Sequence, residues 1–212
     1  MNLHGIGKIK GFMPPHEGKA LIKWASKFSI KGVIMEIGTY CGKSSIYLSV
    51  GAKKNNQTVF TLDHHLGSEE HQINEEYFDK EIYDYSEERV NTLPLLIQNI
   101  NHFKIQNIVP IISESTKASI NWDTNLGILF IDGGHSFESA NNDYLCWESK
   151  IIKGGVLIIH DIFENPSEGG QAPYEIYQKA LKNNYKVYEL SLIHISEPTR
   201  QAEISYAVFC LK

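Results

Sequence analysis

Five short apolar runs, separated by longer segments with helical patterning, constrain the fold of this chain more than any other feature. Each run is followed directly by a glycine or a polar residue. Runs of this length suit strands that are buried on both faces, and alternation of strands with helices produces parallel strand pairs. The sequence therefore predicts an α/β fold, with a doubly wound, mostly parallel sheet covered by helices on both faces. The runs are residues 33–37, 58–62, 108–112, 127–131 and 155–159, and the helices are expected at residues 14–28, 44–50, 93–103, 139–151 and 173–183.

Composition supports one domain and gives no sign of a membrane or nucleic-acid partner. The chain has 212 residues, is 42% hydrophobic and carries a formal net charge of -5 without a basic cluster. A polyanion partner would call for clustered positive charge, and the apolar runs are too short to span a bilayer. We therefore expect a cytoplasmic protein that acts on a small molecule and has no signal peptide; a homo-oligomer remains open.

The C-terminal residues resemble something other than a protein segment. Residues 190–200, LSLIHISEPTR, resemble the in-frame translation of a transposase-type sequencing-library adapter, and residues 204–211, ISYAVFCL, resemble its flow-cell end. The alternative is an ordinary β-strand, which the β-branched and aromatic content favours. We expect residues 1–189 to form the domain of a truncated gene product, and residues 190–212 to be an adapter-derived tail whose strand is not native.

The first predicted strand ends in a glycine-containing turn, EIGTYCGKSS. Gly38 allows a tight turn and close approach of a ligand, and Gly42 and Ser44 open a helix whose free N–H groups favour an anion. A dinucleotide-binding fingerprint requires glycine where Tyr40 stands, so NAD is disfavoured. The stretch resembles the first motif of Rossmann-like class I S-adenosylmethionine-dependent methyltransferases. That resemblance implies that Glu36 reaches the methionine amino group of S-adenosylmethionine and that the loop through Gly38, Thr39, Tyr40, Gly42 and Ser44 follows the methionine and ribose.

The second strand ends in Asp63, and a very polar segment follows it. An aspartate at this position can accept two hydrogen bonds from a ribose diol, and it matches the ribose-binding acid of the methyltransferase family. Residues 64–72, HHLGSEEHQ, are open to three interpretations, namely a substrate lid, a metal site or a solvated loop, and residues 64–92 are expected to form a lid or substrate insert. The segment resembles a DHHRGSEEHQ-like signature of a bacterial methyltransferase subgroup, from which Leu66 departs. The resemblance adds His64 to the cofactor-binding candidates, and it places Glu114 and Ser115, after the third strand, near adenine.

The fourth and fifth strands end in IDGGH and IIHD. We expect Asp132 and His135 to meet His160 and Asp161 across neighbouring strand ends. Two carboxylates at a cleft can hold a divalent cation, and an imidazole beside them can take a proton from a substrate hydroxyl. The pattern resembles macrocin-type and mycinamicin-type sugar O-methyltransferases and the cephalosporin hydroxylase-like group. That resemblance assigns the general base to His135 and metal ligation to Asp132 and Asp161, so His135 and Asp132 are the catalytic candidates. His160 lies beside them and is added as a candidate ligand for Mg²⁺ or Mn²⁺.

His160 departs from these groups, which usually carry an acid at this position. The imidazole either weakens magnesium binding, favours a softer ion such as manganese or zinc, or indicates that no metal binds. The expected function is S-adenosylmethionine-dependent O-methylation of a small-molecule hydroxyl. Two alternatives remain open: a metal-dependent hydroxylase-like enzyme of the same fold, and a non-catalytic S-adenosylmethionine-binding module.

Overall fold

The computed structural model describes residues 3–75, 77–134, 136–183, 185–191 and 206–211 of the chain. Within these residues the main sheet has seven strands in the order β5-β2-β1-β6-β7-β9-β8. The strands are β1 (Val33–Ile37), β2 (Val59–Asp63), β5 (Ile108–Ile112), β6 (Leu126–Ile131), β7 (Ile151–His160), β8 (Tyr185–Ser191) and β9 (Tyr206–Leu211). A small hairpin, β3 (Tyr83–Asp84) and β4 (Arg89–Val90), lies outside this sheet. The predicted α/β fold, with a doubly wound and mostly parallel sheet, is confirmed.

The strand order reverses between β1 and β6. From β1 the chain proceeds to β2 and β5 on one side, and then returns to add β6 and β7 on the other, with all four pairings parallel. Such a switch point opens a crevice beyond the carboxyl ends of the strands, where open α/β sheets bind their ligands. β6 is buried along its whole length, whereas β5 is a partly exposed edge strand that tolerates Pro110.

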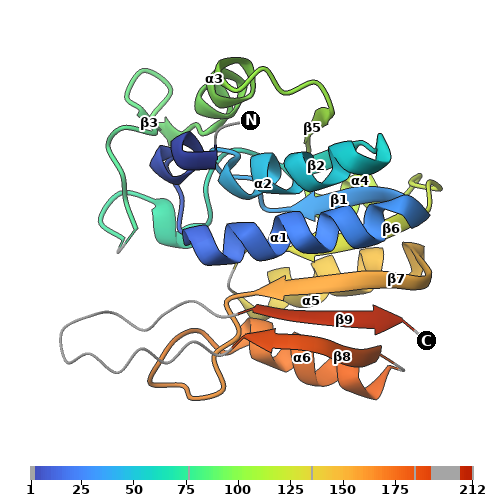
Figure 1. Cartoon of the computed structure of the whole chain (residues 1–212). Coiled ribbons are helices and arrows are strands. Elements are labelled where there is room, and N and C mark those ends of the chain that lie inside the picture. The colour runs from blue at the N-terminus through green and yellow to red at the C-terminus, as the bar shows by residue number, and fades with distance from the viewer. Residues whose placement is uncertain (1–2, 76, 135, 184, 192–205, 212) are drawn as a thin grey trace.

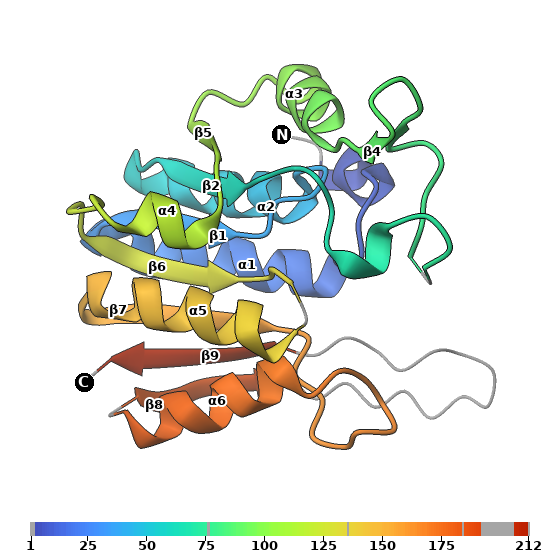
Figure 2. The same ribbon diagram turned by 180° about the vertical axis from the view of Figure 1, so that it is seen from behind.

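Helices cover both faces of the sheet, as Figures 1 and 2 show from opposite sides. α1 and α2 lie on one face, and α4, α5 and α6 lie on the other. Their bounds are α1 (Pro15–Phe28), α2 (Lys43–Ala52), α3 (Leu93–His102), α4 (Ser115–Ser119), α5 (Phe137–Trp147) and α6 (Ala172–Lys182). Short 3-10 helices add η1 (Leu3–Lys8), η2 (Ser29–Lys31), η3 (Lys53–Asn55), η4 (Glu69–His71) and η5 (Glu148–Lys150). Among the described residues, no helix combines the length and the apolar character that crossing a membrane would require.

α1 and α2 lie next to each other on the same face of the sheet, but their sequence patterns differ. α1 starts with Pro15 at its first turn and buries Leu21, Trp24 and Phe28 along one stripe, the pattern of a surface helix. α2 is buried almost all round, because it packs against α1 and against β1, β2 and β5 of the sheet. Gly51 permits this close packing, since a Cβ there would lie 2.5 Å from the backbone oxygen of Ile22.

Two predicted boundaries differ from the structure by more than two residues. The helix expected over residues 139–151 ends at Trp147, and β7 begins at Ile151 rather than near residue 155. Ile151 pairs with Leu126 across an irregular step in the ladder, which extends the strand beyond its apolar run. α4 was not predicted, because a five-residue helix shows no apolar periodicity.

Residues of the expected adapter-derived tail take part in the sheet. β9 pairs antiparallel with β7 on one side and with β8 on the other, and Ala207, Val208 and Phe209 are buried there. A β-forming sequence of any origin can make these backbone pairs, so the adapter origin and the domain boundary at residue 189 stay predictions. Residues 192–205 lie outside the described residues.

The contact between α1 and α2 gives a stability prediction. Gly51→Ala places a methyl group against the Ile22 carbonyl oxygen, and we expect it to lower the free energy of unfolding by about 1–3 kcal/mol despite the higher helix propensity of alanine. Gly7→Ala is the matched control, because a Cβ there meets nothing within 4 Å. Urea unfolding followed by circular dichroism compares the two variants. Equal stability of Gly51→Ala and wild type would contradict the packing.

Candidate active site

A cavity of about 1100 Å³ lies at the carboxyl ends of the parallel strands. Its wall includes a residue at or just beyond the end of every parallel strand: Gly38, Asp63, Ser113, Asp132 and His160. The polar clusters that end the apolar runs therefore converge on one cavity, as the sequence predicted. Of the predicted cofactor-binding residues, the wall includes Gly38, Thr39, Tyr40, Ser44, Asp63, His64, Glu114 and Ser115, and it does not include Glu36 or Gly42.

Asp63 fastens the glycine loop of β1 to the end of β2. Its Oδ2 accepts hydrogen bonds from the backbone N–H groups of Thr39 and Tyr40, both at 2.9 Å. Its Oδ1 accepts a third from the backbone N–H of His65 at 2.7 Å. The carboxylate is thus fixed in place and still faces the cavity, where the second lone pair of Oδ1 remains available to a ligand donor.

Two glycines of the loop adopt backbone conformations that favour glycine. Gly38 has φ +87°, and a Cβ on it would lie 2.0 Å from the carbonyl oxygen of Asp132. Gly42 has φ +86° and precedes α2, where a Cβ would meet the side chain of Leu96. The first glycine therefore lets the ends of β1 and β6 touch, and the second sets the start of the helix.

Glu36 lies beneath the cavity wall. It is fully buried and hydrogen-bonds to the hydroxyl groups of Ser44 and Ser45. Burial raises the pKa of Glu36 to about 8, although the two serines act in the opposite direction. Its Oε1 has no hydrogen-bond partner among the described residues. Through these hydrogen bonds the side chain links the end of β1 to the first turn of α2. Its contact with a cofactor stays a prediction.

The insert after Asp63 borders the cavity. Residues from Gly67 to His71 line it, as does Tyr77, and η4 lies within this stretch. His71 stacks on Tyr40 with ring centroids 5.3 Å apart, and Tyr77 packs edge-on against Phe12 at 5.4 Å. These four rings form an aromatic wall that sequence patterns did not reveal, because its members come from three separate segments.

Asp143 on α5 is a second residue that the sequence did not reveal. It is buried, lines the cavity and hydrogen-bonds to Ser115, whose hydroxyl oxygen accepts the indole N–H of Trp147 at 2.9 Å. Burial raises the pKa of Asp143 to about 6, with the charge of Asp63 adding to the shift and Ser115 opposing it. Gly133 leaves space for the carboxyl group of Asp143, since a Cβ at Gly133 would lie 2.8 Å from Asp143 Oδ2. The sequence signal that could have revealed Asp143 is the presence of an acidic residue on the otherwise apolar face of α5.

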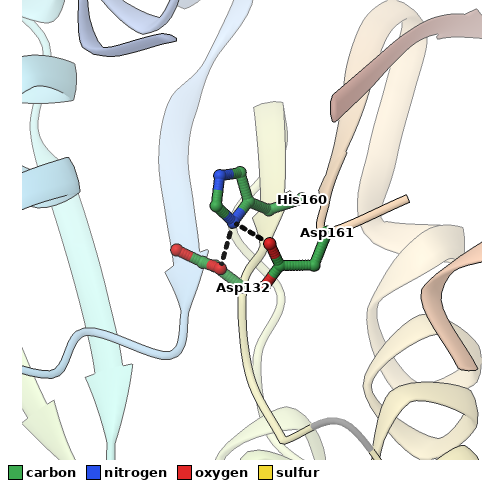
Figure 3. Close-up of side chains that lie close together, drawn as sticks. All are labelled: Asp132, His160 and Asp161. Atoms are coloured by element: carbon green, nitrogen blue, oxygen red, sulfur yellow. Dashed lines mark ion pairs between the residues drawn. The ribbon is translucent and has the colours of Figure 1, made fainter. Parts of the chain in front are cut away.

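Asp132, His160 and Asp161 meet at the ends of β6 and β7, as predicted. His160 Nδ1 lies 2.8 Å from Asp132 Oδ1 and 3.2 Å from Asp161 Oδ1, and Figure 3 shows the ring nitrogen facing both carboxylates. One ligand atom from each side chain falls within 4.8 Å of the others, which suits a single cation. Among the described residues this is the group with metal-ligand geometry, and residues 64–72 do not form one. His135 lies outside the described residues.

His160 is also bound from the side opposite to these carboxylates. Its Nε2 lies 2.8 Å from Oε2 of Glu17 on α1, and both side chains are buried. Burial lowers the pKa of His160, but the neighbouring carboxylates of Asp132 and Asp161 outweigh this and hold that pKa well above its ordinary value. Helix α1 therefore contributes a buried acid to the site.

The comparison with known proteins identifies the domain. A family described as a methyltransferase domain matches residues 35–162, from the first buried strand to the end of the fifth. The chain belongs to this methyltransferase domain family. The matched segment contains the parallel strands of the sheet apart from the first two residues of β1, and it contains the predicted site residues, from Glu36 to Asp161.

Solved structures agree with this assignment at the level of the fold. An O-methyltransferase from Bacillus cereus in complex with SAH has a TM-score of 0.64 and 14% identity, over 99% of this chain and 90% of that chain. The O-methyltransferase TomG from Streptomyces achromogenes in complex with SAM has a TM-score of 0.61 and 12% identity, over 94% and 82%. An rRNA methylase from Streptococcus thermophilus has a TM-score of 0.59 and 9% identity, over 96% and 100%. The sheet is that of the class I S-adenosylmethionine-dependent methyltransferases.

The raised pKa of Asp143 gives a pH prediction. A carboxyl whose pKa is raised from 3.8 to about 6 on folding adds stability that is complete below pH 3.8 and is lost as the pH rises through 6. Asp143→Asn, which is neutral at every pH, removes this dependence. We expect its unfolding free energy relative to wild type to increase by about 3 kcal/mol between pH 3 and pH 8.

The measurement is urea unfolding across this pH range. Asp123→Asn serves as the control, because Asp123 is exposed. A difference between Asp143→Asn and wild type that is constant with pH would show that Asp143 does not titrate in this way.

Proposed function

We propose that this protein transfers the methyl group of S-adenosylmethionine to a hydroxyl group of a small-molecule acceptor. The observation that carries the proposal is the junction of the Gly38 loop with Asp63 on the wall of a cavity large enough for a cofactor and an acceptor together. It lies at the switch point of a methyltransferase-family sheet, where this fold binds ligands.

We place the cofactor along the ends of β1 and β2. The remaining acceptor capacity of Asp63 suits a ribose hydroxyl, and the loop from Gly38 to Tyr40 offers backbone close to the ligand. Ser44 lines the cavity, and its hydroxyl group hydrogen-bonds to the buried carboxyl group of Glu36. We therefore propose that Glu36 acts on the cofactor through Ser44. Ser115 and Asp143 line the cavity at the start of α4 and on α5, and we place adenine beside them. His64 and Glu114 complete the proposed set.

The chemical step needs alignment and removal of a proton from the acceptor. The bound cofactor supplies a methyl group already activated on sulfur. Residues of this chain would hold the acceptor oxygen in line with it and increase the charge of that oxygen as the bond forms. We propose His135 as the base, a role that rests on the sequence. Asp132, His160 and Asp161 fit a divalent cation, and such a cation would offset negative charge on the acceptor oxygen.

The acceptor is proposed to be small and not a nucleic acid. The rRNA methylase likeness shows that the fold does not decide between these classes. Three glutamates of the insert, Glu69, Glu70 and Glu75, line the cavity, and the formal net charge is -5. A polyanion would be repelled from such a wall, whereas the aromatic rings beside it suit a compact organic acceptor. The cytoplasmic location and a possible homo-oligomer stay predictions from the sequence.

Binding of S-adenosylmethionine tests the cofactor assignment. We expect wild type to bind it with micromolar affinity in calorimetry, and Asp63→Ala to weaken binding at least tenfold because a charge-assisted hydrogen bond is lost. Asp63→Asn keeps the size of the side chain and separates loss of charge from loss of loop structure. Asp123→Asn is the surface control. A folded Asp63→Ala protein that binds S-adenosylmethionine as tightly as wild type does would contradict the assignment of Asp63 to the cofactor site.

Methyl transfer tests the base. With an acceptor found by screening hydroxyl compounds against methyl-labelled cofactor, we expect His135→Ala to lower turnover by about 10²–10⁴-fold and to leave cofactor affinity unchanged. His102→Ala is the control, because His102 is exposed on α3. Unchanged turnover in His135→Ala would exclude the base. An absence of transfer by wild type that still binds the cofactor would favour the non-catalytic binding module, and cofactor-independent, metal-dependent oxidation would favour the hydroxylase-like alternative.

A further inference from the structure

The N-terminal helix reaches the candidate metal group through one buried carboxylate. Glu17 lies in the first turn of α1, and His160 ends β7, 143 positions later in the chain. Their side chains are 1% and 3% exposed, and Glu17 Oε2 lies 2.8 Å from His160 Nε2. A buried contact of this kind fixes the imidazole from the side opposite to the cavity.

The two nitrogens of His160 have different surroundings. Nε2 forms a hydrogen bond with Glu17, whereas Nδ1 faces Asp132 and Asp161 at 2.8 and 3.2 Å. Nδ1 therefore has one oxygen from each of two carboxylates as neighbours, whereas Nε2 has the single carboxylate of Glu17. A buried nitrogen aimed at two carboxylate oxygens in this way suits ligation of a cation that all three side chains share (Figure 3).

Charge in this cluster also calls for a cation. Three carboxylates, those of Glu17, Asp132 and Asp161, surround one imidazole. Burial raises the pKa of Glu17, so the charge argument concerns Asp132 and Asp161, whose carboxylates lie together in a largely buried place at a cost that nearby positive charge reduces. A divalent ion between Asp132, Asp161 and His160 would offset it.

Glu17 is held rigidly enough to orient its partner. The next residue, Gly18, packs against the ring of Tyr47 on α2, where a Cβ would lie 2.3 Å from the ring. Helix α1 is further fixed by Trp24 and Phe28, which are buried in the core. The backbone that carries Glu17 is therefore held in place by packing on both sides of that residue's turn.

We propose that Glu17 is a positioning residue: by accepting the Nε2–H of His160 it directs Nδ1 at Asp132 and Asp161, and it thereby makes the site selective for an ion that accepts imidazole, such as Mn²⁺, over Mg²⁺. The inference rests on the metal part of the proposed function. Outer carboxylates that orient a ligating histidine in this way change metal affinity by about 10–100-fold. Magnesium prefers oxygen ligands, so it gains little from the nitrogen.

The test uses the ions themselves and needs no acceptor. Binding of Mn²⁺ to the full chain is measured by electron paramagnetic resonance of the free ion, with Mg²⁺ as competitor, for wild type, Glu17→Ala and Glu17→Gln. We expect wild type to bind Mn²⁺ at least tenfold more tightly than Mg²⁺. We expect Glu17→Ala to lose about 10–100-fold in Mn²⁺ affinity and little in Mg²⁺ affinity, and Glu17→Gln, whose amide oxygen still accepts Nε2–H, to recover part of the loss.

A second readout reports the ring directly. With ¹⁵N-labelled histidine and diamagnetic Zn²⁺, wild-type His160 should carry its proton on Nε2 and none on Nδ1, and Glu17→Ala should lose this pattern. Lys19→Ala, on the exposed side of the same helix, is the matched control and should behave as wild type does. If Glu17→Ala fails to fold, Glu17→Gln still tests the proposal, because a neutral acceptor should lower Mn²⁺ affinity measurably.

Two results would overturn the inference. One is Mn²⁺ affinity unchanged in a folded Glu17→Ala protein, and the other is a wild type that binds neither Mn²⁺ nor Zn²⁺ and shows His160 protonated on both nitrogens. Calorimetry with S-adenosylmethionine on the same samples separates this failure from failure of the proposed function. If the protein binds S-adenosylmethionine but no metal ion, only the proposed role of Glu17 is contradicted. If it binds neither S-adenosylmethionine nor a metal ion, the methyltransferase proposal is contradicted as well.

Discussion

The close approach of the β1 and β6 strand ends is the constraint on which the rest of the site depends. Gly38 lies so near the carbonyl oxygen of Asp132 that any Cβ would collide with it. This contact brings the loop after β1, with its backbone N–H groups bound by Asp63, beside the carboxylate of Asp132. In the proposed function, a cofactor at the first strand ends and an acceptor at the last ones would therefore face each other across this contact. The chemistry of the site follows from this juxtaposition at the switch point of the sheet.

Buried carboxyl groups lie close to the cavity, and each one has a different hydrogen-bond partner that offsets the cost of its burial. Glu36 is bound by two serine hydroxyls, Asp143 by Ser115, and Glu17 by His160. Burial raises the pKa of Glu36 and of Asp143, so these groups favour the neutral form more than exposed acids do. At His160 the balance is reversed, because its neighbours are themselves acids and favour a positive charge. The end of β7 thus favours a positive charge on His160, whereas burial around Asp143 favours the neutral carboxyl group.

Much of the site could be predicted from sequence, and the reason is geometric. Parallel strands that are buried on both faces have recognisable apolar runs, and their carboxyl ends meet at one edge, so the residues that follow the runs must converge. Asp63, Asp132, His160 and Asp161 were found in this way. Glu17 and the aromatic wall were not. Glu17 comes from helix α1, and the wall combines rings from the segment before α1, the loop after β1 and the insert, so both depend on packing between segments distant in sequence. Asp143 was missed because helical periodicity shows which face is buried but not which buried position opens onto a cavity.

The sequence by itself determined the class of sheet, the succession of strands and helices along the chain, the turn at Gly38 and the acids at the strand ends, since these follow from local hydrophobic period and from backbone conformations that only glycine adopts readily. Only the tertiary structure decided which side chains reach the cavity. It placed Glu36 beneath the wall, brought Glu17 across 143 positions to His160, and gave residues 206–211 a place between β7 and β8. These outcomes depend on long-range packing and on satisfying buried polar groups, and neither is encoded in any single stretch of the chain.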